Sequence, residues 1–220
     1  ISTQAAADGS SYLEMGNTKV ICTVTGPAEL KGTGGARAGG DKADVRVEIS
    51  VAGFSGVDRK KRARNDKRVS EMQTTISNAF AQSLFTNLYP HSSISLSLHV
   101  LSQDGSLLAA CLNACTLALI DAGVPMRDYI CACTAGSTSS YSSGSVAGFE
   151  WLEEQELPFL TVGTLGNSDK VSVLVMETRV QVGRLEGMLA VGVDGCKQVR
   201  EILDQVVRKR GAKILEGSQL

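Results

Sequence analysis

A turn that contains glycine leads into an apolar helix at residues 103–123, QDGSLLAACLNACTLALIDAG. The free backbone N–H groups at the start of such a helix can bind a phosphate. A phosphate site also needs a cation or hydroxyl beside those amides, because charged donors make the stronger bonds to the anion. Leu107 and Leu108 occupy the positions where such groups would stand. The segment is therefore either a weak anion site or the remnant of one.

A basic stretch, RKKRARNDKR, covers residues 59–68. It holds seven basic residues against one acidic residue, and these charges repel one another unless an anion lies near them. A solvated charged loop is the ordinary interpretation of such a run, but nucleic acid is the partner that we favour. Because aromatic residues are only 5% of the chain, binding should depend on phosphates and tolerate any sequence. The candidates for phosphate contact are Arg59, Lys60, Lys61, Arg62, Arg64, Lys67 and Arg68.

Three further features carry weaker signals. GTGGARAGG at 32–40 is followed by neither GK[ST] nor a helix, so a flexible connector is a better interpretation than a phosphate-binding loop. His91 and His99 lie beside no recognisable nucleophile motif. The acidic run EWLEEQE at 150–156 offers paired carboxylates for a metal or for acid catalysis, although a plain surface turn or short helix is the ordinary alternative.

The cysteines and the composition indicate an ordinary globular protein of 220 residues, 43% apolar and 20% charged. The six cysteines show no zinc-ligand spacing, and we expect buried, reduced thiols and no metal, with redox or metal use as the alternative. No stretch reaches the roughly 18 apolar residues of a membrane-spanning helix. The N-terminus ISTQAAADGS lacks the order of a signal peptide. These features predict an intracellular protein with no membrane partner.

The predicted strands and helices must position these residues. Alternating or β-branched runs predict strands, and apolar residues three or four apart predict helices. Gly16 and Asn17 are the expected turn of a first hairpin that Pro27 ends. The predicted strands are 10–15, 18–25, 44–51, 93–102, 129–136, 158–165 and 170–178. The predicted helices are 66–88, one that follows Asp104 and Gly105 and ends at Gly123, and 182–210.

The remaining segments and the order of the elements predict the fold class. Asp66 can cap the first helix, and 30–43 and 137–148 are expected to be loops because they are rich in glycine or serine. The elements follow as strands, helix, strand, helix, strands, helix, without an interdomain linker. This order predicts one α/β or α+β domain, with antiparallel hairpins and helices packed on the sheet.

Five segments together resemble the RNase PH family, and most of all the ring subunits of the eukaryotic RNA exosome that correspond to the catalytic ring subunit of archaea. These segments are ADGSSYLEMGNTKVICTVTGP, KRVSEMQT after the basic loop, HVLSQDG, LNACTLALIDAGVPMRDYI and RLEGMLAVGVDGCKQVRE. The resemblance implies a single RNase PH-like domain over 1–220, with mixed sheets, helices packed on them and the architecture called ribosomal protein S5 domain 2-like. The family's opening R-x-D-G-R is absent, so Ile1 is expected to follow a missing N-terminal family segment.

Active members of the family are phosphorolytic 3'-to-5' exoribonucleases, and the resemblance implies that this chain has lost their phosphate clamp. They bind phosphate at a helix start with the motif D-G-G-T-R or D-G-G-S-R. The matching residues here are Asp104, Gly105, Ser106, Leu107 and Leu108. Two isobutyl groups thus replace the hydroxyl and the guanidinium.

The other catalytic parts of the family are half retained. The carboxylate pair near D-L-x-x-x-E-D matches Gly148 and Glu154, so one carboxylate is absent. An arginine pair that holds RNA matches Lys67 and Arg68, so positive charge remains there. Loss of one oriented charged group often costs about 10² to 10³ in rate. We therefore expect RNA contact without phosphorolysis.

The resemblance implies a non-catalytic, RNA-binding subunit of the exosome core ring, which takes part in 3'-to-5' RNA processing and degradation. It would pair with another RNase PH-like subunit in a six-membered ring with RNA-binding cap proteins. The basic residues of 59–68 would line the pore and help thread single-stranded RNA to a separate hydrolytic nuclease. We expect no cofactor, and a location in the nucleus, nucleolus and cytoplasm. Two alternatives are an active phosphorolytic exoribonuclease completed by a partner subunit and a stand-alone RNA-binding protein.

Overall fold

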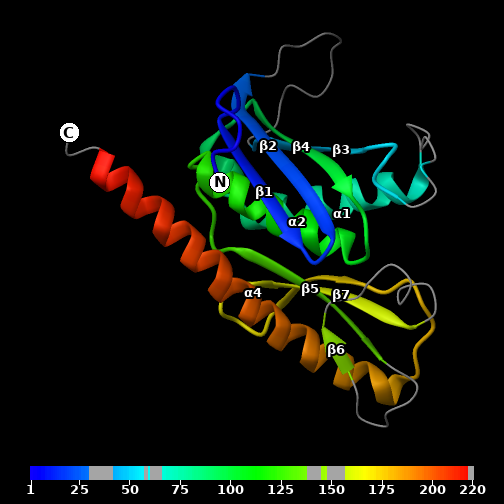
Figure 1. Cartoon of the computed structure of the whole chain (residues 1–220). Coiled ribbons are helices and arrows are strands. Elements are labelled where there is room, and N and C mark those ends of the chain that lie inside the picture. The colour runs from blue at the N-terminus through cyan, green and yellow to red at the C-terminus, as the bar shows by residue number, and fades with distance from the viewer. Residues whose placement is uncertain (30–41, 57–58, 60–65, 138–144, 148–156, 218–220) are drawn as a thin grey trace.

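The computed structural model describes residues 1–29, 42–56, 59, 66–137, 145–147 and 157–217. Its elements form four layers, which alternate between sheets and helices (Figure 1). A first sheet lies at the top of the view, above helices α1 (Lys67–Ser83) and α2 (Leu107–Asp121). A second sheet lies below them, and helix α4 (Val182–Gly217) crosses its lower face. The mixed α/β architecture predicted from the sequence is confirmed.

The first sheet has the strand order β1-β2-β4-β3. Its strands are β1 (Gly9–Met15), β2 (Thr18–Glu29), β3 (Asp44–Val51) and β4 (Ser92–Ser102). The predicted hairpin is confirmed, since Met15 pairs with Thr18 across the turn. The pairing of β3 with β4 is parallel and the other two pairings are antiparallel. Both strands that were predicted by alternation, at 44–51 and 93–102, are present.

The prediction that Pro27 ends the hairpin is wrong. β2 continues to Glu29, with a change of register between Thr25 and Ala28 that passes the proline. A proline lacks the N–H of the ladder, and such irregularities are where a strand accepts one.

The helices begin close to where the sequence predicted, but α1 and α4 end at other residues than predicted. The Asp66 side chain caps α1 by accepting the Arg68 backbone N–H at 3.2 Å. α1 ends at Ser83 rather than 88, because Leu84 is extended and forms an isolated bridge with Met126. A 3-10 turn, η1, follows at Thr86–Leu88. α4 runs to Gly217, beyond the predicted end at 210.

The second sheet has the order β6-β5-β7-β8 and is antiparallel throughout. Its strands are β5 (Ile130–Ser137), β6 (Ser145–Ala147), β7 (Phe159–Leu165) and β8 (Val171–Val175). The prediction of a loop over all of 137–148 is wrong for residues 145–147, which pair with β5. Their serine-rich surroundings hide any alternation of apolar residues. Residues 30–41, part of the predicted glycine-rich loop, lie outside the described residues.

α2 joins the two sheets, and almost all of its side chains are buried. On one side, Ser11 of β1 donates its hydroxyl to the carbonyl of Ala114 at 2.7 Å. On the other side, the Asn113 amide donates to the carbonyl of Ala132 and accepts its N–H, both at 2.8 Å. The Thr116 hydroxyl donates to the carbonyl of Ile130 at 2.7 Å. Because buried polar groups are costly when unpaired, these bonds fix α2 against both sheets.

All six cysteines are buried and free, as the sequence predicted. Cys131 and Cys133 share the face of β5 that packs on α4. Burial raises the pKa of the Cys131 thiol to about 12 and raises the pKa values of Cys111, Cys115 and Cys196 as well. Since the thiolate is the nucleophile, these side chains are unreactive in the folded protein. No helix in the described part of the chain is long and apolar enough to cross a membrane.

We predict that the folded protein at pH 8 resists thiol reagents, because burial excludes the reagent from all six cysteines and raised pKa values keep Cys111, Cys115, Cys131 and Cys196 protonated. A disulfide-exchange dye should label fewer than one thiol per chain within minutes, and all six after denaturation in guanidinium. Rapid labelling of several cysteines in the native state would contradict the packing described here.

We predict that Gly9→Ala destabilises the protein by about 3 kcal/mol. A Cβ at Gly9 would lie 2.4 Å from the Ala118 carbonyl oxygen and 2.4 Å from the Ala122 nitrogen, and neither backbone atom can move away cheaply. Gly211→Ala is the matched control, because nothing lies within 4 Å of its Cβ position in α4 and alanine favours the helix. Urea unfolding measures both variants. Equal midpoints for Gly9→Ala and the wild type would refute this close contact.

Candidate RNA and phosphate site

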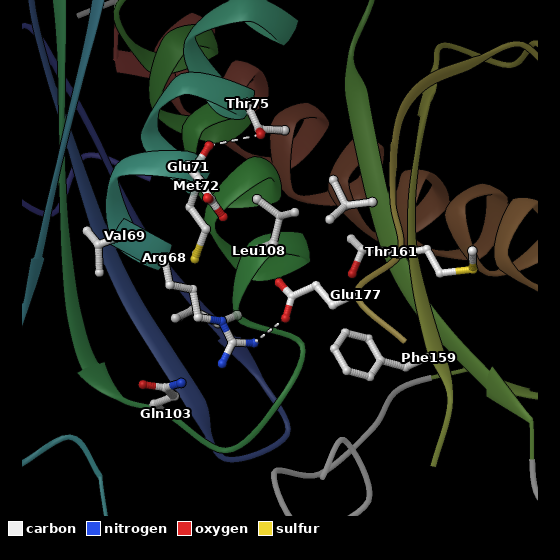
Figure 2. A pocket seen from close by; sticks show the side chains of 13 residues that line it. Arg68, Val69, Glu71, Met72, Thr75, Gln103, Leu108, Phe159, Thr161 and Glu177 are labelled. Carbon is white, nitrogen blue, oxygen red and sulfur yellow. Dashed lines mark hydrogen bonds and ion pairs between the residues drawn. The ribbon is translucent and has the colours of Figure 1, made fainter. Parts of the chain in front are cut away.

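A cavity of about 280 Å³ lies where the starts of α1 and α2 face the second sheet (Figure 2). It brings together residues from α1, the end of β4, the start of α2, β7 and the end of β8. The lining residues are Arg68, Val69, Glu71, Met72, Thr75, Gln103, Leu107, Leu108, Phe159, Thr161, Val175, Met176 and Glu177. Thus Leu107, Leu108 and Arg68, which the sequence singled out separately, share one site.

The turn before α2 is held by the first hairpin. The Thr18 hydroxyl donates to the Gly105 carbonyl at 2.7 Å and accepts the Asp104 N–H at 3.0 Å. Gly105 and Ser106 have φ values of 80° and 51°, in the left-handed region. The family motif has glycine at both positions, and the backbone here keeps the conformation that favours it. The turn before α2 is therefore fixed by β2 and left-handed at both positions.

The side chains of this turn do not fit an anion. Leu107 is 8% exposed and Leu108 is half-buried, and both line the cavity. Figure 2 shows Leu108 between α1 and the strand that carries Thr161. An anion placed beside these leucines would lose water on its apolar side without gaining a charged donor from the turn, which is unfavourable. The turn itself offers only the α2 amides, and the guanidinium of Arg68 lies elsewhere in the cavity.

Arg68 already has an anionic partner inside the cavity. Its Nη2 lies 3.2 Å from Oε2 of Glu177, as Figure 2 shows. The two side chains are 53% and 47% exposed. An ion pair this open to water contributes only about 0 to 1 kcal/mol. The Arg68 guanidinium is therefore neutralised by Glu177 but can exchange that partner cheaply.

Glu177 is the site residue that the sequence did not reveal. It follows β8 in the strand segment predicted at 170–178, and it belongs to no charge cluster or motif. Only the packing of the second sheet against α1 brings its carboxylate to Arg68. A single sequence carries no signal for that contact.

The structure describes some of the other predicted site residues and not the rest. Arg59 is exposed, and its N–H donates to the Gly56 carbonyl at 3.1 Å. Lys67 is exposed at the first position of α1. Lys60, Lys61, Arg62, Arg64, Gly148, Glu154 and the rest of the acidic run 150–156 lie outside the described residues. His91 and His99 are exposed and do not line the cavity.

Metal chemistry receives no support from the described part of the chain. Within it, no three His, Cys, Asp or Glu side chains gather in a way that could hold a metal ion. The carboxylates of the cavity, Glu71 and Glu177, come from opposite sides, and Glu177 pairs with Arg68.

Comparison with known families identifies the class. Residues 1–125 match the RNase PH family, described as "3' exoribonuclease family, domain 1". The fold agrees with a crystal structure of rice (Oryza sativa) Rrp46, with a TM-score of 0.81 at 20% identity over 94% of this chain and 91% of that chain. An Archaeoglobus fulgidus exosome with RNA bound to the active site gives a TM-score of 0.72 at 17% identity, over 91% of this chain and 85% of that one. The chain belongs to the RNase PH family, as the sequence motifs predicted.

Within this family, the chain is similar to exosome components. It is 40% identical over 209 residues to the exosome complex component ski6 of Schizosaccharomyces pombe, covering 95% of this chain and 84% of that protein. It is 40% identical over 215 residues to the exosome complex component RRP41 of Homo sapiens, covering 97% and 86% respectively. The resemblance to exosome ring subunits seen in the sequence is confirmed.

We predict that Glu177→Gln raises the affinity for single-stranded RNA by up to about fivefold, because it releases the Arg68 guanidinium for a phosphate. One added phosphate contact should steepen the salt dependence of log affinity by about 0.7. Fluorescence anisotropy at several KCl concentrations measures both quantities.

Glu71→Gln is the control, because Glu71 lines the same cavity but is not the ion-pair partner of Arg68. Both variants remove one negative charge, so only the freed Arg68 should distinguish them. An equal gain in RNA affinity in both variants, or no gain in Glu177→Gln, would contradict the role of Glu177 as the residue that restrains Arg68.

Proposed function

We propose that the protein is a non-catalytic, RNA-binding subunit of the RNA exosome core ring. In this role it supports 3'-to-5' processing and degradation of ribosomal and messenger RNA by guiding single-stranded RNA to a separate nuclease. The observation that carries the proposal is the pair Leu107 and Leu108 in the cavity, where active family members have a hydroxyl and a guanidinium.

The physical argument concerns the attacking group of phosphorolysis. Inorganic phosphate must be held beside the RNA end, and a charged, oriented clamp supplies most of that binding. Here the clamp is apolar, and the nearest described guanidinium, Arg68, pairs with Glu177. Gly148 stands at the sequence position of a catalytic carboxylate. Each lost group costs about 10² to 10³ in rate, so the two losses together leave no useful turnover.

RNA contact rests on groups that remain. Arg59, Lys67 and Arg68 are exposed cations, and Arg68 lines the cavity. They suit phosphate contacts that do not depend on base sequence. A subunit with these cations and without the clamp can bind a transcript and pass it on.

The names of the similar proteins support the assembly that we propose. Those compared above carry the name exosome complex component, and two of the similar solved structures are archaeal exosomes. We infer a place beside another RNase PH-like subunit in a six-membered ring, with RNA-binding cap proteins and a hydrolytic nuclease as further partners. We also infer a location in the nucleus, nucleolus and cytoplasm, and no cofactor.

The purified complex should release no nucleoside diphosphates from end-labelled RNA in the presence of phosphate and Mg²⁺. Thin-layer separation distinguishes the products, because hydrolysis gives monophosphates and phosphorolysis gives diphosphates. Diphosphates that disappear when this chain carries Lys67→Ala and Arg68→Ala would overturn the proposal in favour of an active phosphorolytic enzyme. A lone 23 kDa species in cells would instead favour a stand-alone RNA-binding protein.

We predict that the double change Leu107→Ser and Leu108→Arg restores phosphate binding at the start of α2 without restoring phosphorolysis. The hydroxyl and guanidinium would complete the preserved turn, but Gly148 still lacks the carboxylate. Calorimetric titration should detect phosphate at millimolar concentration for this variant. Leu108→Met, which keeps an apolar side chain, is the control and should behave as the wild type. Failure of the double variant to bind phosphate, in a folded protein, would contradict the clamp argument.

A further inference from the structure

A short turn after β3 displays Phe54 to solvent. The Phe54 side chain is 69% exposed, the highest value among the aromatic residues in the described part of the chain. Single exposed apolar residues are common and usually need no explanation. The segments around Phe54, however, are suited to contact with a nucleic acid.

The turn is fixed rather than loose. The Ala52 N–H donates to the Val100 carbonyl at 3.0 Å, and the Ser55 N–H donates to the Ala52 carbonyl at 3.0 Å. The Ser55 carbonyl accepts the Gln103 N–H at 2.9 Å, and Ser55 itself is buried. The residues on either side of Phe54 are therefore tied to the end of β4. A ring held outward on a fixed backbone loses little freedom when it stacks on a ligand.

The same bonds link the turn that carries Phe54 to two segments that carry cations. Gln103, bonded to the turn through Ser55, lines the cavity together with Arg68, and both are labelled in Figure 2. On the other side, the Arg59 N–H donates to the Gly56 carbonyl at 3.1 Å, so an exposed arginine follows the turn directly. A strand of RNA whose phosphates meet Arg59 and Arg68 would pass the Phe54 ring.

Phe85 provides a useful contrast. It is the next most exposed phenylalanine, at 44%, but the guanidinium of Arg127 lies over its ring, 6.0 Å from the centroid. Its exposed face is thus already in contact with a cation of the same chain. No such internal cation covers Phe54 among the residues that the structure describes.

We propose that Phe54 is a stacking platform for one base of the single-stranded RNA, while the neighbouring cations hold the flanking phosphates. The inference rests on the RNA contact proposed above and adds a base contact to it. Every base offers a π-face, so the contact strengthens binding without selecting a sequence. It adds a base contact to the phosphate contacts that the sequence predicted.

The test measures RNA affinity of the full chain in its assembled complex, by anisotropy, for Phe54→Ala, Phe54→Trp and the control Phe85→Ala. Phe54→Ala should weaken binding of an ordinary single strand by about 5- to 150-fold. Phe54→Trp should keep or exceed wild-type affinity, and Phe85→Ala should leave it unchanged. An abasic oligonucleotide keeps the phosphates and removes the bases, so wild type and Phe54→Ala should bind it equally.

Two results would overturn the inference: unchanged binding of ordinary RNA by Phe54→Ala, or an equal loss for ordinary and abasic strands. Quenching of tryptophan emission by RNA, greater in Phe54→Trp than in the wild type, is the second readout. If the wild-type complex binds no RNA, or if its RNA affinity is unaffected by every change at Arg59, Lys67 and Arg68, the proposed function itself fails. That outcome is distinct from a failure of Phe54 alone.

Discussion

The burial of α2 between two sheets is the constraint on which the rest of the molecule depends. Its small and apolar side chains let both sheets approach, and Ser11, Asn113 and Thr116 bond it to the strands above and below. A helix held in this way cannot rotate or slide. Its first turn is therefore presented to the cavity in one orientation, whatever side chains stand there.

Because α2 is held in this way, the backbone of its first turn does not depend on the side chains that the turn carries. The turn of Gly105 and Ser106 keeps its left-handed backbone because the hairpin and α2 require it. The fold does not need polar side chains at positions 107 and 108. Leu107 and Leu108 pack well there, at the border of the apolar core. The backbone turn at the start of α2 is thus fixed by the fold, while the side chains that it presents to the cavity are apolar. The exposed Arg68–Glu177 pair keeps a cation in the same cavity.

The sequence predicted most of the elements because their periodicity is strong, as in β4, or because turn residues mark both ends, as in α2 between Gly105 and Gly123. The sequence-based prediction failed where strand pairing with distant segments overrides the local residue pattern. Pro27 lies inside β2, and β6 forms in a serine-rich segment. For the site, it predicted Leu107, Leu108 and Arg68 as separate features. Their meeting in one cavity, the partnership with Glu177 and the exposure of Phe54 depend on packing that no single stretch encodes.

A structure of the assembled complex, determined with single-stranded RNA in a phosphate buffer, tests the central claim most directly. The account predicts RNA density beside Arg59 and Arg68 and no phosphate ion on the amides at the start of α2. An ordered phosphate bonded to the N–H groups of Leu107 and Leu108, next to the 3' end of the RNA, would contradict it.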